Sequence, residues 1–127
     1  MAMQKDTKIL IVDDDPFILE MYALKFKEQG FQIVTATDGK MALSQIEKEM
    51  PDIVLLDVVM PKMDGFDVMK KIAEISSRPF KILFLTNFGQ KEDVEKGLQL
   101  GADGYIIKAH FTPSEVVTKV KQVLNIS

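Results

Sequence analysis

The most informative stretch of the sequence is Pro51-Asp52-Ile53-Val54-Leu55-Leu56-Asp57, in which a short apolar run leads into a carboxylate. Four successive apolar residues, bounded by a proline that no helix continues through, predict a strand buried on both faces. Open sheets of such parallel strands carry their chemistry at the carboxyl ends of the strands. We therefore expect Asp57 to lie at the functional edge of a sheet, beside a loop shaped by Pro61 and Gly65.

Strand and helix patterns alternate along the rest of the chain, with short connections and no repeat. Comparable apolar runs predict four further strands, at residues 8–12, 31–36, 81–85 and 104–107. Helical spacing of apolar residues, with capping residues and prolines at helix starts, predicts five helices, at residues 16–29, 40–49, 66–75, 92–100 and 113–124. This alternation predicts an α/β fold: a doubly wound five-stranded parallel sheet in the flavodoxin-like order 2-1-3-4-5, with helices on both faces.

The length suits one domain, which we place at residues 8–125, after a polar N-terminal tail at residues 1–7. The net charge of −3 argues against a nucleic-acid-binding surface, which needs a basic stripe. The sequence contains no cysteine, which excludes disulfides and thiolate chemistry and fits a reducing cytoplasm. No apolar run approaches the ~18 residues of a membrane span, so we expect no membrane partner.

Five polar side chains follow the predicted strands at one edge of the sheet: Asp13, Asp14, Asp57, Thr86 and Lys108. Converging carboxylates repel one another, by on the order of 4 kcal/mol per pair at ~4 Å and an effective dielectric constant of ~20. Such a cluster requires a cation, and oxygen ligands with room for water favour Mg²⁺. A hard cation, an ammonium and a hydroxyl around one carboxylate are the groups that phosphoryl transfer to that carboxylate requires.

These residues resemble a known family, the receiver domain of two-component response regulators, and within it the chemotaxis-type single-domain receivers. The resemblance extends over residues 8–124 and rests on four segments in the same order and spacing: Ile11–Pro16, Asp57–Gly65, Leu85-Thr86 and Gly101–Lys108. It implies a phosphoacceptor that takes its phosphoryl group from a sensor histidine kinase or a phosphotransfer protein. It also implies a downstream protein target or output domain that reads the phosphorylated state.

The resemblance implies a role for each residue at this edge. Asp57 is the expected phosphoacceptor, and the domain is expected to catalyse its own phosphorylation and dephosphorylation without turning over another substrate. Asp14 and Asp57 are expected to bind Mg²⁺ directly, Asp13 through water, and Val59 through its backbone carbonyl. The apolar side chains of Val59 and Phe88 are expected to flank the site.

The resemblance also implies a conformational switch. Lys108 is expected to pair with the phosphoryl group, while Thr86 hydrogen-bonds it and moves toward it. Tyr105 is the expected switch aromatic, which rotates inward as Thr86 withdraws. Gly97 weakens its helix, by about 1 kcal/mol relative to alanine, as suits a movable element. The expected output face, which would also serve a homodimer, comprises residues 92–100, 104–107 and 113–124.

Two positions depart from the family pattern. Ala109 stands where a proline with a cis peptide bond usually follows the lysine, and since a cis bond before a non-proline costs ~3 kcal/mol, we expect a trans bond. Asn87 stands where a small residue usually follows the threonine, and its amide either crowds the phosphoryl group or hydrogen-bonds it. His110, the only histidine, falls in a predicted loop and is expected to be a surface residue.

Two other functions stay open on the sequence alone. An aspartyl-nucleophile phosphatase also uses Asp, Thr and Lys with Mg²⁺. Such enzymes carry an Asp-x-Asp-x-Thr signature, and Asp13–Phe17 resembles it but has Phe17 in place of the threonine. A binding module would keep the fold without phosphorylation. A flavodoxin-type carrier is excluded, because no Ser/Thr-rich phosphate loop follows the first strand. Since the last predicted helix ends the sequence, we expect either a protein that acts alone by docking or an excised domain of a longer protein.

Overall fold

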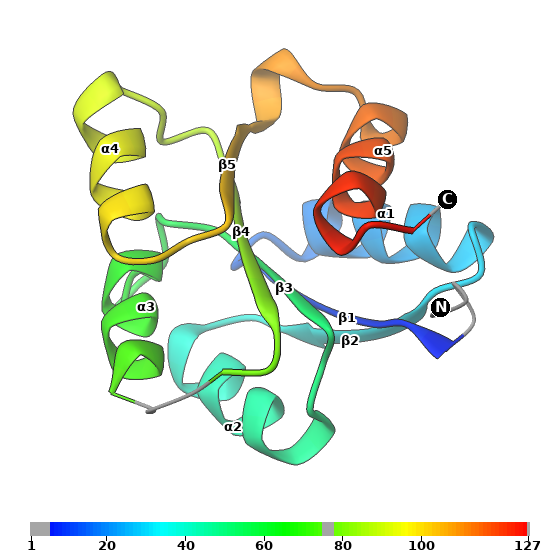
Figure 1. Ribbon diagram of the computed structural model, residues 1–127, viewed down its shortest axis with the longest axis horizontal. Helices are drawn as coiled ribbons and strands as arrows, with labels where there is room; N and C mark the ends of the chain where they lie inside the picture. Colours follow the sequence, from blue (N-terminus) through cyan, green and yellow to red (C-terminus); the bar gives the residue numbers. More distant parts are fainter. Residues whose placement is uncertain (1–5, 75–77, 127) are drawn as a thin grey trace.

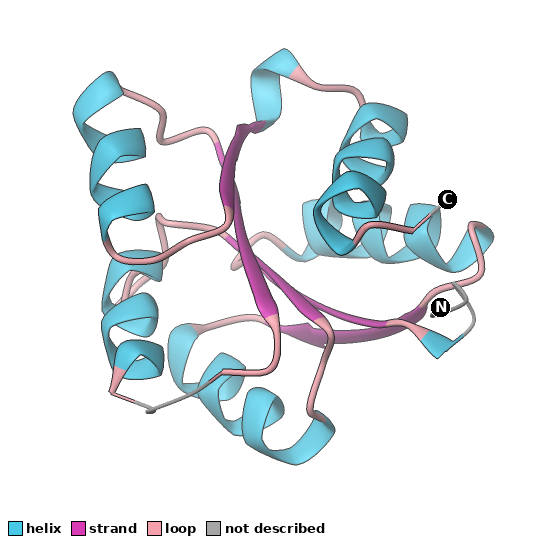
Figure 2. Cartoon of the chain, in the orientation of Figure 1, coloured by secondary structure: helices cyan, strands magenta, loops and turns pink. Residues whose placement is uncertain are grey.

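The computed structural model describes residues 6–74 and 78–126 and confirms the predicted α/β architecture (Figures 1 and 2). Within these residues, parallel strands form one sheet in the order β2-β1-β3-β4-β5. The strands are β1 (Lys8–Val12), β2 (Gln32–Ala36), β3 (Ile53–Leu56), β4 (Lys81–Thr86) and β5 (Gly104–Ile107). The helices are α1 (Pro16–Glu28), α2 (Gly39–Glu49), α3 (Gly65–Ala73), α4 (Lys91–Gln99) and α5 (Pro113–Leu124).

The helices cover both faces of the sheet, α1 and α5 on one side and α2, α3 and α4 on the other (Figure 1). Apolar side chains of the central strands alternate between the two cores. Those in the core with α1 and α5 include Ile9, Ile11, Ile53 and Leu55, and those in the other core include Leu10, Val12, Val54 and Leu56. All eight are at most 1 % exposed, so the two strands that lead to the predicted site are fixed by burial on both faces.

Helix starts follow the capping signals of the sequence. Asp15 caps α1 by accepting hydrogen bonds from two backbone N–H groups of the first turn, and Pro16 occupies the first helical position. Thr112 and Glu115 form the predicted capping box of α5. These caps set the direction in which each helix leaves the carboxyl edge of the sheet.

The helix boundaries agree with the predicted ones to within two residues. α2 begins at Gly39, because Asp38 accepts a hydrogen bond of 2.7 Å from the N–H of Met41 and so caps the helix one residue earlier. α4 lies one residue earlier at both ends. The predicted end of the third helix, at Ile75, and the residues 76–77 that follow it lie outside the described residues.

The folded region includes Thr7, which the sequence analysis assigned to the tail. Thr7 is buried, and its carbonyl oxygen accepts a hydrogen bond of 3.0 Å from the N–H of Gln32. This bond continues the pairing of β1 with β2 by one residue. Residues 1–5 of the predicted tail lie outside the described residues.

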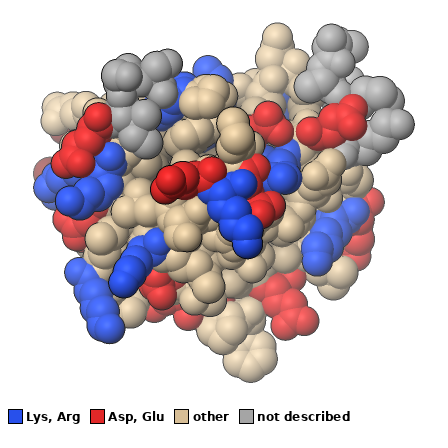
Figure 3. Space-filling model, turned by 90° about the horizontal axis from the view of Figure 1, so that it is seen from below, with Lys and Arg blue, Asp and Glu red and all other residues tan. Residues whose placement is uncertain are grey.

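The surface drawn in Figure 3 carries acidic and basic side chains side by side, and no basic stripe crosses that face. The formal net charge of the whole sequence is −3. Among the helices of residues 6–74 and 78–126, none is both long and apolar enough to cross a membrane.

Candidate functional site

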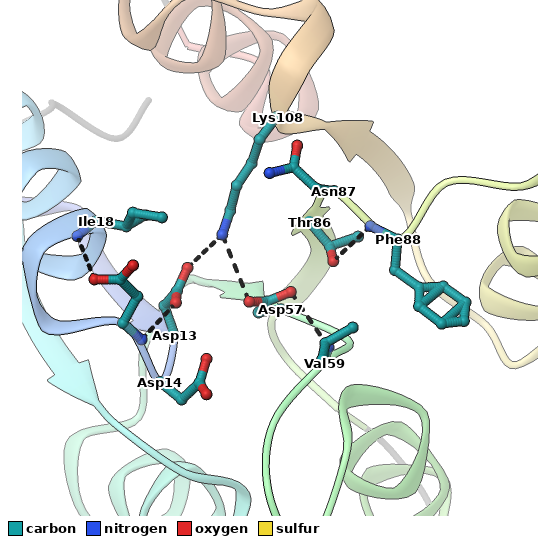
Figure 4. Close-up of a pocket in the computed structure, with 10 residues that line it drawn as sticks. Asp13, Asp14, Ile18, Asp57, Val59, Thr86, Asn87, Phe88 and Lys108 are labelled. Carbon is teal, nitrogen blue, oxygen red and sulfur yellow. Dashed lines mark hydrogen bonds and ion pairs between the residues drawn. The ribbon is translucent and has the colours of Figure 1, made fainter.

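Three carboxylates meet at the carboxyl edge of the sheet, because β1 and β3 are neighbours in register. Val12 pairs with Leu56, so the residues that follow them, Asp13 and Asp57, leave the sheet next to each other. Asp14 comes directly after, and carboxylate oxygens of all three residues lie within 4.8 Å of one another. The structure therefore brings together the acidic residues that the sequence analysis grouped (Figure 4).

Backbone hydrogen bonds hold the two buried carboxylates. Asp13 accepts a bond of 2.9 Å from the N–H of Asp15, and Asp57 accepts one of 3.4 Å from the N–H of Val59. Asp13 is 3 % exposed and Asp57 is 7 % exposed, whereas Asp14 is open to solvent. Water and ions therefore reach the cluster from the side of Asp14.

Lys108 supplies the positive charge of the site. Its Nζ donates a hydrogen bond to Oδ2 of Asp13 and lies 3.5 Å from Oδ2 of Asp57. Burial by itself lowers the pKa of a lysine, but hydrogen bonds to the two carboxylates and their charges outweigh burial and raise the pKa of Lys108. The ammonium is therefore charged and held between two acids.

Asp57 lies in a setting that disfavours its ionised form. Burial raises the pKa of Asp57, and the charge of Asp13 adds to this, while the Thr86 hydroxyl and the Lys108 ammonium lower it without cancelling the rise. Thr86 is the last residue of β4 and is fully buried. The ionised Asp57 would thus be stabilised by any further positive charge that entered the site.

The site carries more negative than positive charge. Three carboxylates face the ammonium of Lys108, which lies near Asp13 and Asp57, while Asp14 forms no ion pair within residues 6–74 and 78–126. Closely spaced carboxylate oxygens suit a small hard cation, and the exposed carboxylate of Asp14 leaves the cluster open to water. The cluster can therefore hold a metal ion.

The carboxylates open into a cavity of about 470 Å³. Its lining consists of Asp13, Asp14, Asp15, Ile18, Asp57, Val59, Thr86, Asn87, Phe88 and Lys108. Val59 and Phe88 flank the cavity, in agreement with the prediction. Ile18 was not predicted to line the cavity, although the cap at Asp15 places the first turn of α1, and with it Ile18, beside the strand ends.

Tyr105 packs beside the site and does not line the cavity. Its ring centroid lies 5.3 Å from that of Phe84, and its hydroxyl donates a hydrogen bond to the carbonyl oxygen of Phe88. A Cβ added to Gly97 would lie 3.0 Å from the same ring. The glycine that weakens α4 in isolation therefore also makes room for Tyr105 against the helix.

The two departures from the family pattern meet beside Lys108. No peptide bond in the described residues is cis, which confirms the trans bond expected before Ala109. Lys108–His110 form a 3₁₀ turn, η2, in which His110 is exposed, as expected. Asn87 accepts a hydrogen bond of 2.9 Å from the N–H of Ala109, a partner that was not predicted from the sequence.

Known sequences share the segments that carry this site. The family model of the response regulator receiver domain matches residues 9–121. The alkaline phosphatase synthesis transcriptional regulatory protein PhoP of Bacillus subtilis is 41 % identical over 117 residues, which are 92 % of this chain and 48 % of PhoP. The DNA-binding response regulator MtrA of Mycolicibacterium smegmatis is 40 % identical over 114 residues, 90 % of this chain and 49 % of MtrA. The chain thus spans about half the length of these relatives.

Solved structures share the same fold. The chemotaxis protein CheY4 of Vibrio cholerae has a TM-score of 0.85 and 33 % identity, over 92 % of this chain and 98 % of that one. A CheY-like receiver domain protein of Methanospirillum hungatei has a TM-score of 0.86 and 31 % identity, over 94 % of each chain. Because the family match extends from β1 into α5, the chain belongs to the response regulator receiver domains, the phosphoacceptor modules of two-component signal transduction.

Proposed function

We propose that Asp57 accepts a phosphoryl group from the phosphohistidine of a sensor histidine kinase or a phosphotransfer protein. The observation that carries the proposal is the position of Lys108, whose ammonium lies between Asp13 and Asp57 in the cavity that the buried Thr86 also lines. An ammonium, a hydroxyl donor and room for a cation around one carboxylate are the requirements for stabilising a transferring phosphoryl group.

In the proposed transfer, an oxygen of Asp57 forms the new P–O bond while the P–N bond of the phosphohistidine breaks, and the imidazole keeps the bonding electron pair. Lys108 and Thr86 stabilise the added negative charge by donating hydrogen bonds to the phosphoryl oxygens. Attack by water on the phosphorus later releases inorganic phosphate and restores the carboxylate. The domain therefore catalyses its own phosphorylation and dephosphorylation and turns over no other substrate.

Mg²⁺ is the proposed cation of the acidic cluster, bound directly by Asp14 and Asp57, through water by Asp13, and by the backbone carbonyl of Val59. Every one of these donors is an oxygen, and the exposure of Asp14 leaves room for the waters that Mg²⁺ retains. When bound, Mg²⁺ supplies charge that offsets the excess of carboxylates and the charge of the incoming phosphoryl group.

Thr86 and Tyr105 are the proposed switch residues, and two hydrogen bonds through Phe88 connect them. The N–H of Phe88 donates to Oγ1 of Thr86 at 3.2 Å, and the Tyr105 hydroxyl donates to the carbonyl oxygen of Phe88. When the Thr86 hydroxyl turns toward a phosphoryl group, it loses its hydrogen bond with Phe88. The loop at Phe88, to which Tyr105 is hydrogen-bonded, then shifts. Tyr105 then rotates inward and changes the face of α4, β5 and α5.

The same face is the proposed docking surface for a downstream target or output domain, and for a second copy of the chain. We place the domain in the cytoplasm, since a cysteine-free sequence suits a reducing compartment, and propose no direct nucleic-acid contact by this acidic domain. The chemotaxis-type single-domain assignment stays a prediction. PhoP is named a transcriptional regulatory protein and MtrA a DNA-binding response regulator, and both are about twice as long as the matched region.

Intact-mass spectrometry after incubation with acetyl phosphate and Mg²⁺ tests the proposed function. The wild-type chain is expected to gain one phosphoryl group, and neither the Asp57→Asn variant nor the wild type in excess EDTA is expected to gain it. An unmodified wild type, or a modified Asp57→Asn variant, contradicts the proposal. Sustained hydrolysis of a phosphomonoester would instead support the phosphatase alternative.

A further inference from the structure

A side-chain hydrogen bond connects the two loops that carry the donors of the site. Oδ1 of Asn87 accepts a bond of 2.9 Å from the backbone N–H of Ala109. Asn87 directly follows Thr86, and Ala109 directly follows Lys108. We call this bond between Asn87 and Ala109 the latch.

The latch lies one step beyond the regular pairing of the two strands. The ladder between β4 and β5 ends with the pair Thr86 and Ile107. Beyond it the chain after β5 turns into η2, where the N–H of Phe111 bonds the carbonyl oxygen of Lys108 at 3.2 Å. A side-chain carbonyl thus replaces the main-chain acceptor that a longer strand would offer. The backbone on the C-terminal side of Lys108 is thereby tied to β4.

The latch depends on both unusual residues at once. A proline at position 109 would have no N–H to donate, and a glycine or alanine at position 87 would have no side-chain acceptor. The structure shows that the two departures from the family pattern bind each other. Proline restricts the backbone through its ring, whereas Ala109 leaves that restriction to a hydrogen bond.

We propose that Asn87 is a positioning residue, which acts through the latch to aim Lys108 at Asp13 and Asp57, and at the phosphoryl group after transfer. This inference rests on the proposed function. The latch also fixes the orientation of the amide, since its oxygen is taken by Ala109. In Figure 4 the Asn87 nitrogen points to the side of Lys108. The amide oxygen, which would repel a phosphoryl group, therefore points toward Ala109 on the neighbouring loop.

The first experiment measures the rate of phosphorylation by acetyl phosphate at saturating Mg²⁺. Asn87→Ala is expected to react about three- to tenfold more slowly than the wild type, the range expected for loss of one ordinary hydrogen bond. His110→Ala is the matched control, because His110 lies in the same turn, is exposed and has no part in the latch. It is expected to react at the wild-type rate.

Epistasis separates positioning of Lys108 from a general loss of structure. In a Lys108→Met background, Asn87→Ala is expected to cause no further decrease in rate, because no ammonium is left to aim. In an Ala109→Pro background it is likewise expected to be silent, because the donor of the latch is absent. Hydrogen exchange of the Ala109 amide, followed by NMR, is expected to be faster in Asn87→Ala than in the wild type.

The outcomes distinguish the latch from the function on which it rests. A wild-type chain that acetyl phosphate does not modify overturns the proposed function. If the wild type is modified and Asn87→Ala reacts at the wild-type rate, the positioning role of Asn87 is wrong. It is also wrong if Asn87→Ala lowers the rate of the Lys108→Met variant by the same factor as it lowers that of the wild type. Unchanged exchange of the Ala109 amide overturns the latch itself. Slower transfer only in chains that retain both Lys108 and the Ala109 N–H supports it.

Discussion

The two halves of the site are held in different ways. The acidic half consists of Asp13, Asp14 and Asp57 and follows β1 and β3; the donor half consists of Thr86, Asn87 and Lys108 and follows β4 and β5. In the acidic half, backbone hydrogen bonds fix the positions of the aspartates. The N–H of Asp57 bonds the carbonyl of Val12 at 3.0 Å, and the N–H of Asp13 bonds that of Ala36 at 3.1 Å, so the sheet ladder continues into the site.

In the donor half, side chains connect loops to one another. Asn87 bonds Ala109, Oγ1 of Thr86 accepts from Phe88, and Tyr105 bonds the carbonyl oxygen of Phe88. The two bonds at Phe88 can exchange for others when a new acceptor enters the site, at a modest net cost, whereas the latch is the bond that we infer to keep Lys108 in place. In the proposed switch, the acidic half is therefore the fixed receptor for charge, and the bonds at Phe88 are the part that rearranges.

The largest expected effect comes from a change beside the acidic half, Gly65→Ala. A Cβ at Gly65 would overlap the carbonyl oxygen of Asp57 and lie 2.8 Å from Cα of Val58, and backbone atoms cannot move aside as a side chain can. We expect the free energy of unfolding to fall by about 3 kcal/mol, at the upper end of typical overpacking. Urea denaturation followed by circular dichroism measures this change.

The matched control is Gly97→Ala, on the side of the donor half. Its Cβ would lie 3.0 Å from the Tyr105 ring and 3.1 Å from the Phe84 ring. Alanine gains about 1 kcal/mol of helix propensity over glycine, which offsets these tight contacts with side chains. We expect a net change of less than about 1 kcal/mol. Equal losses in Gly65→Ala and Gly97→Ala would show that the two halves are equally rigid.

The second expected effect is stabilisation by Mg²⁺. A cation that binds only the folded chain raises the free energy of unfolding by about 2.7 kcal/mol at a concentration of 100 times its Kd. The melting temperature should therefore rise with Mg²⁺ in the wild type, and little in Asp57→Asn, which lacks one of the proposed ligands. KCl at matched ionic strength is the control, and an equal response of both proteins to Mg²⁺ would refute a shared site.

The acidic half could be predicted from the sequence, because local sequence patterns determine where its carboxylates lie. An apolar run that ends in aspartate places Asp57 at the edge of a sheet, and the order of the strands places Asp13 beside it. Nothing in these steps requires knowledge of a loop conformation. The prediction of converging carboxylates was accordingly confirmed in the structure.

The donor half could be predicted only in part, because its geometry depends on where two loops meet. Thr86 and Lys108 follow strands and were placed at the correct edge. The partner of Asn87 depends on the turn after β5, and no local pattern predicts that the N–H of Ala109 comes within reach of the side chain. The packing of Tyr105 against Gly97 likewise depends on how α4 docks.

The third prediction distinguishes two of the carboxylates, Asp13 and Asp14, by their partners. Asp14 has no ion pair within residues 6–74 and 78–126, whereas Asp13 hydrogen-bonds Lys108. In the absence of Mg²⁺, Asp14→Asn should raise the free energy of unfolding, by on the order of 1 kcal/mol, because it relieves repulsion between solvated carboxylates that lie within 4.8 Å of one another. Asp13→Asn should not, because it removes a partner of a buried ammonium. Thermal melts in EDTA measure both, and a stabilised Asp13→Asn would invalidate this division.

The smallest expected effect concerns the bond between Tyr105 and Phe88 in the donor half. Burial, together with the charges of Asp93 and Asp57, raises the pKa of Tyr105 from 10.0 to about 12. The folded chain therefore binds more protons than the unfolded chain between these values. Stability contributed by the neutral tyrosine is fully present below pH 10 and is lost as pH rises toward 12.

Phenolate absorbance measures this titration directly, because the sequence contains two tyrosines and no tryptophan. The difference between the wild-type curve and that of Tyr105→Phe isolates Tyr105 from Tyr22, whose pKa burial also raises. We expect a midpoint near 12 for this difference, provided that circular dichroism shows a folded chain at each pH. A midpoint near 10 would place the Tyr105 hydroxyl in open solvent. The loop at Phe88 would then be free of the ring, and the proposed route from Thr86 to the face of α4 and β5 would lose its connection.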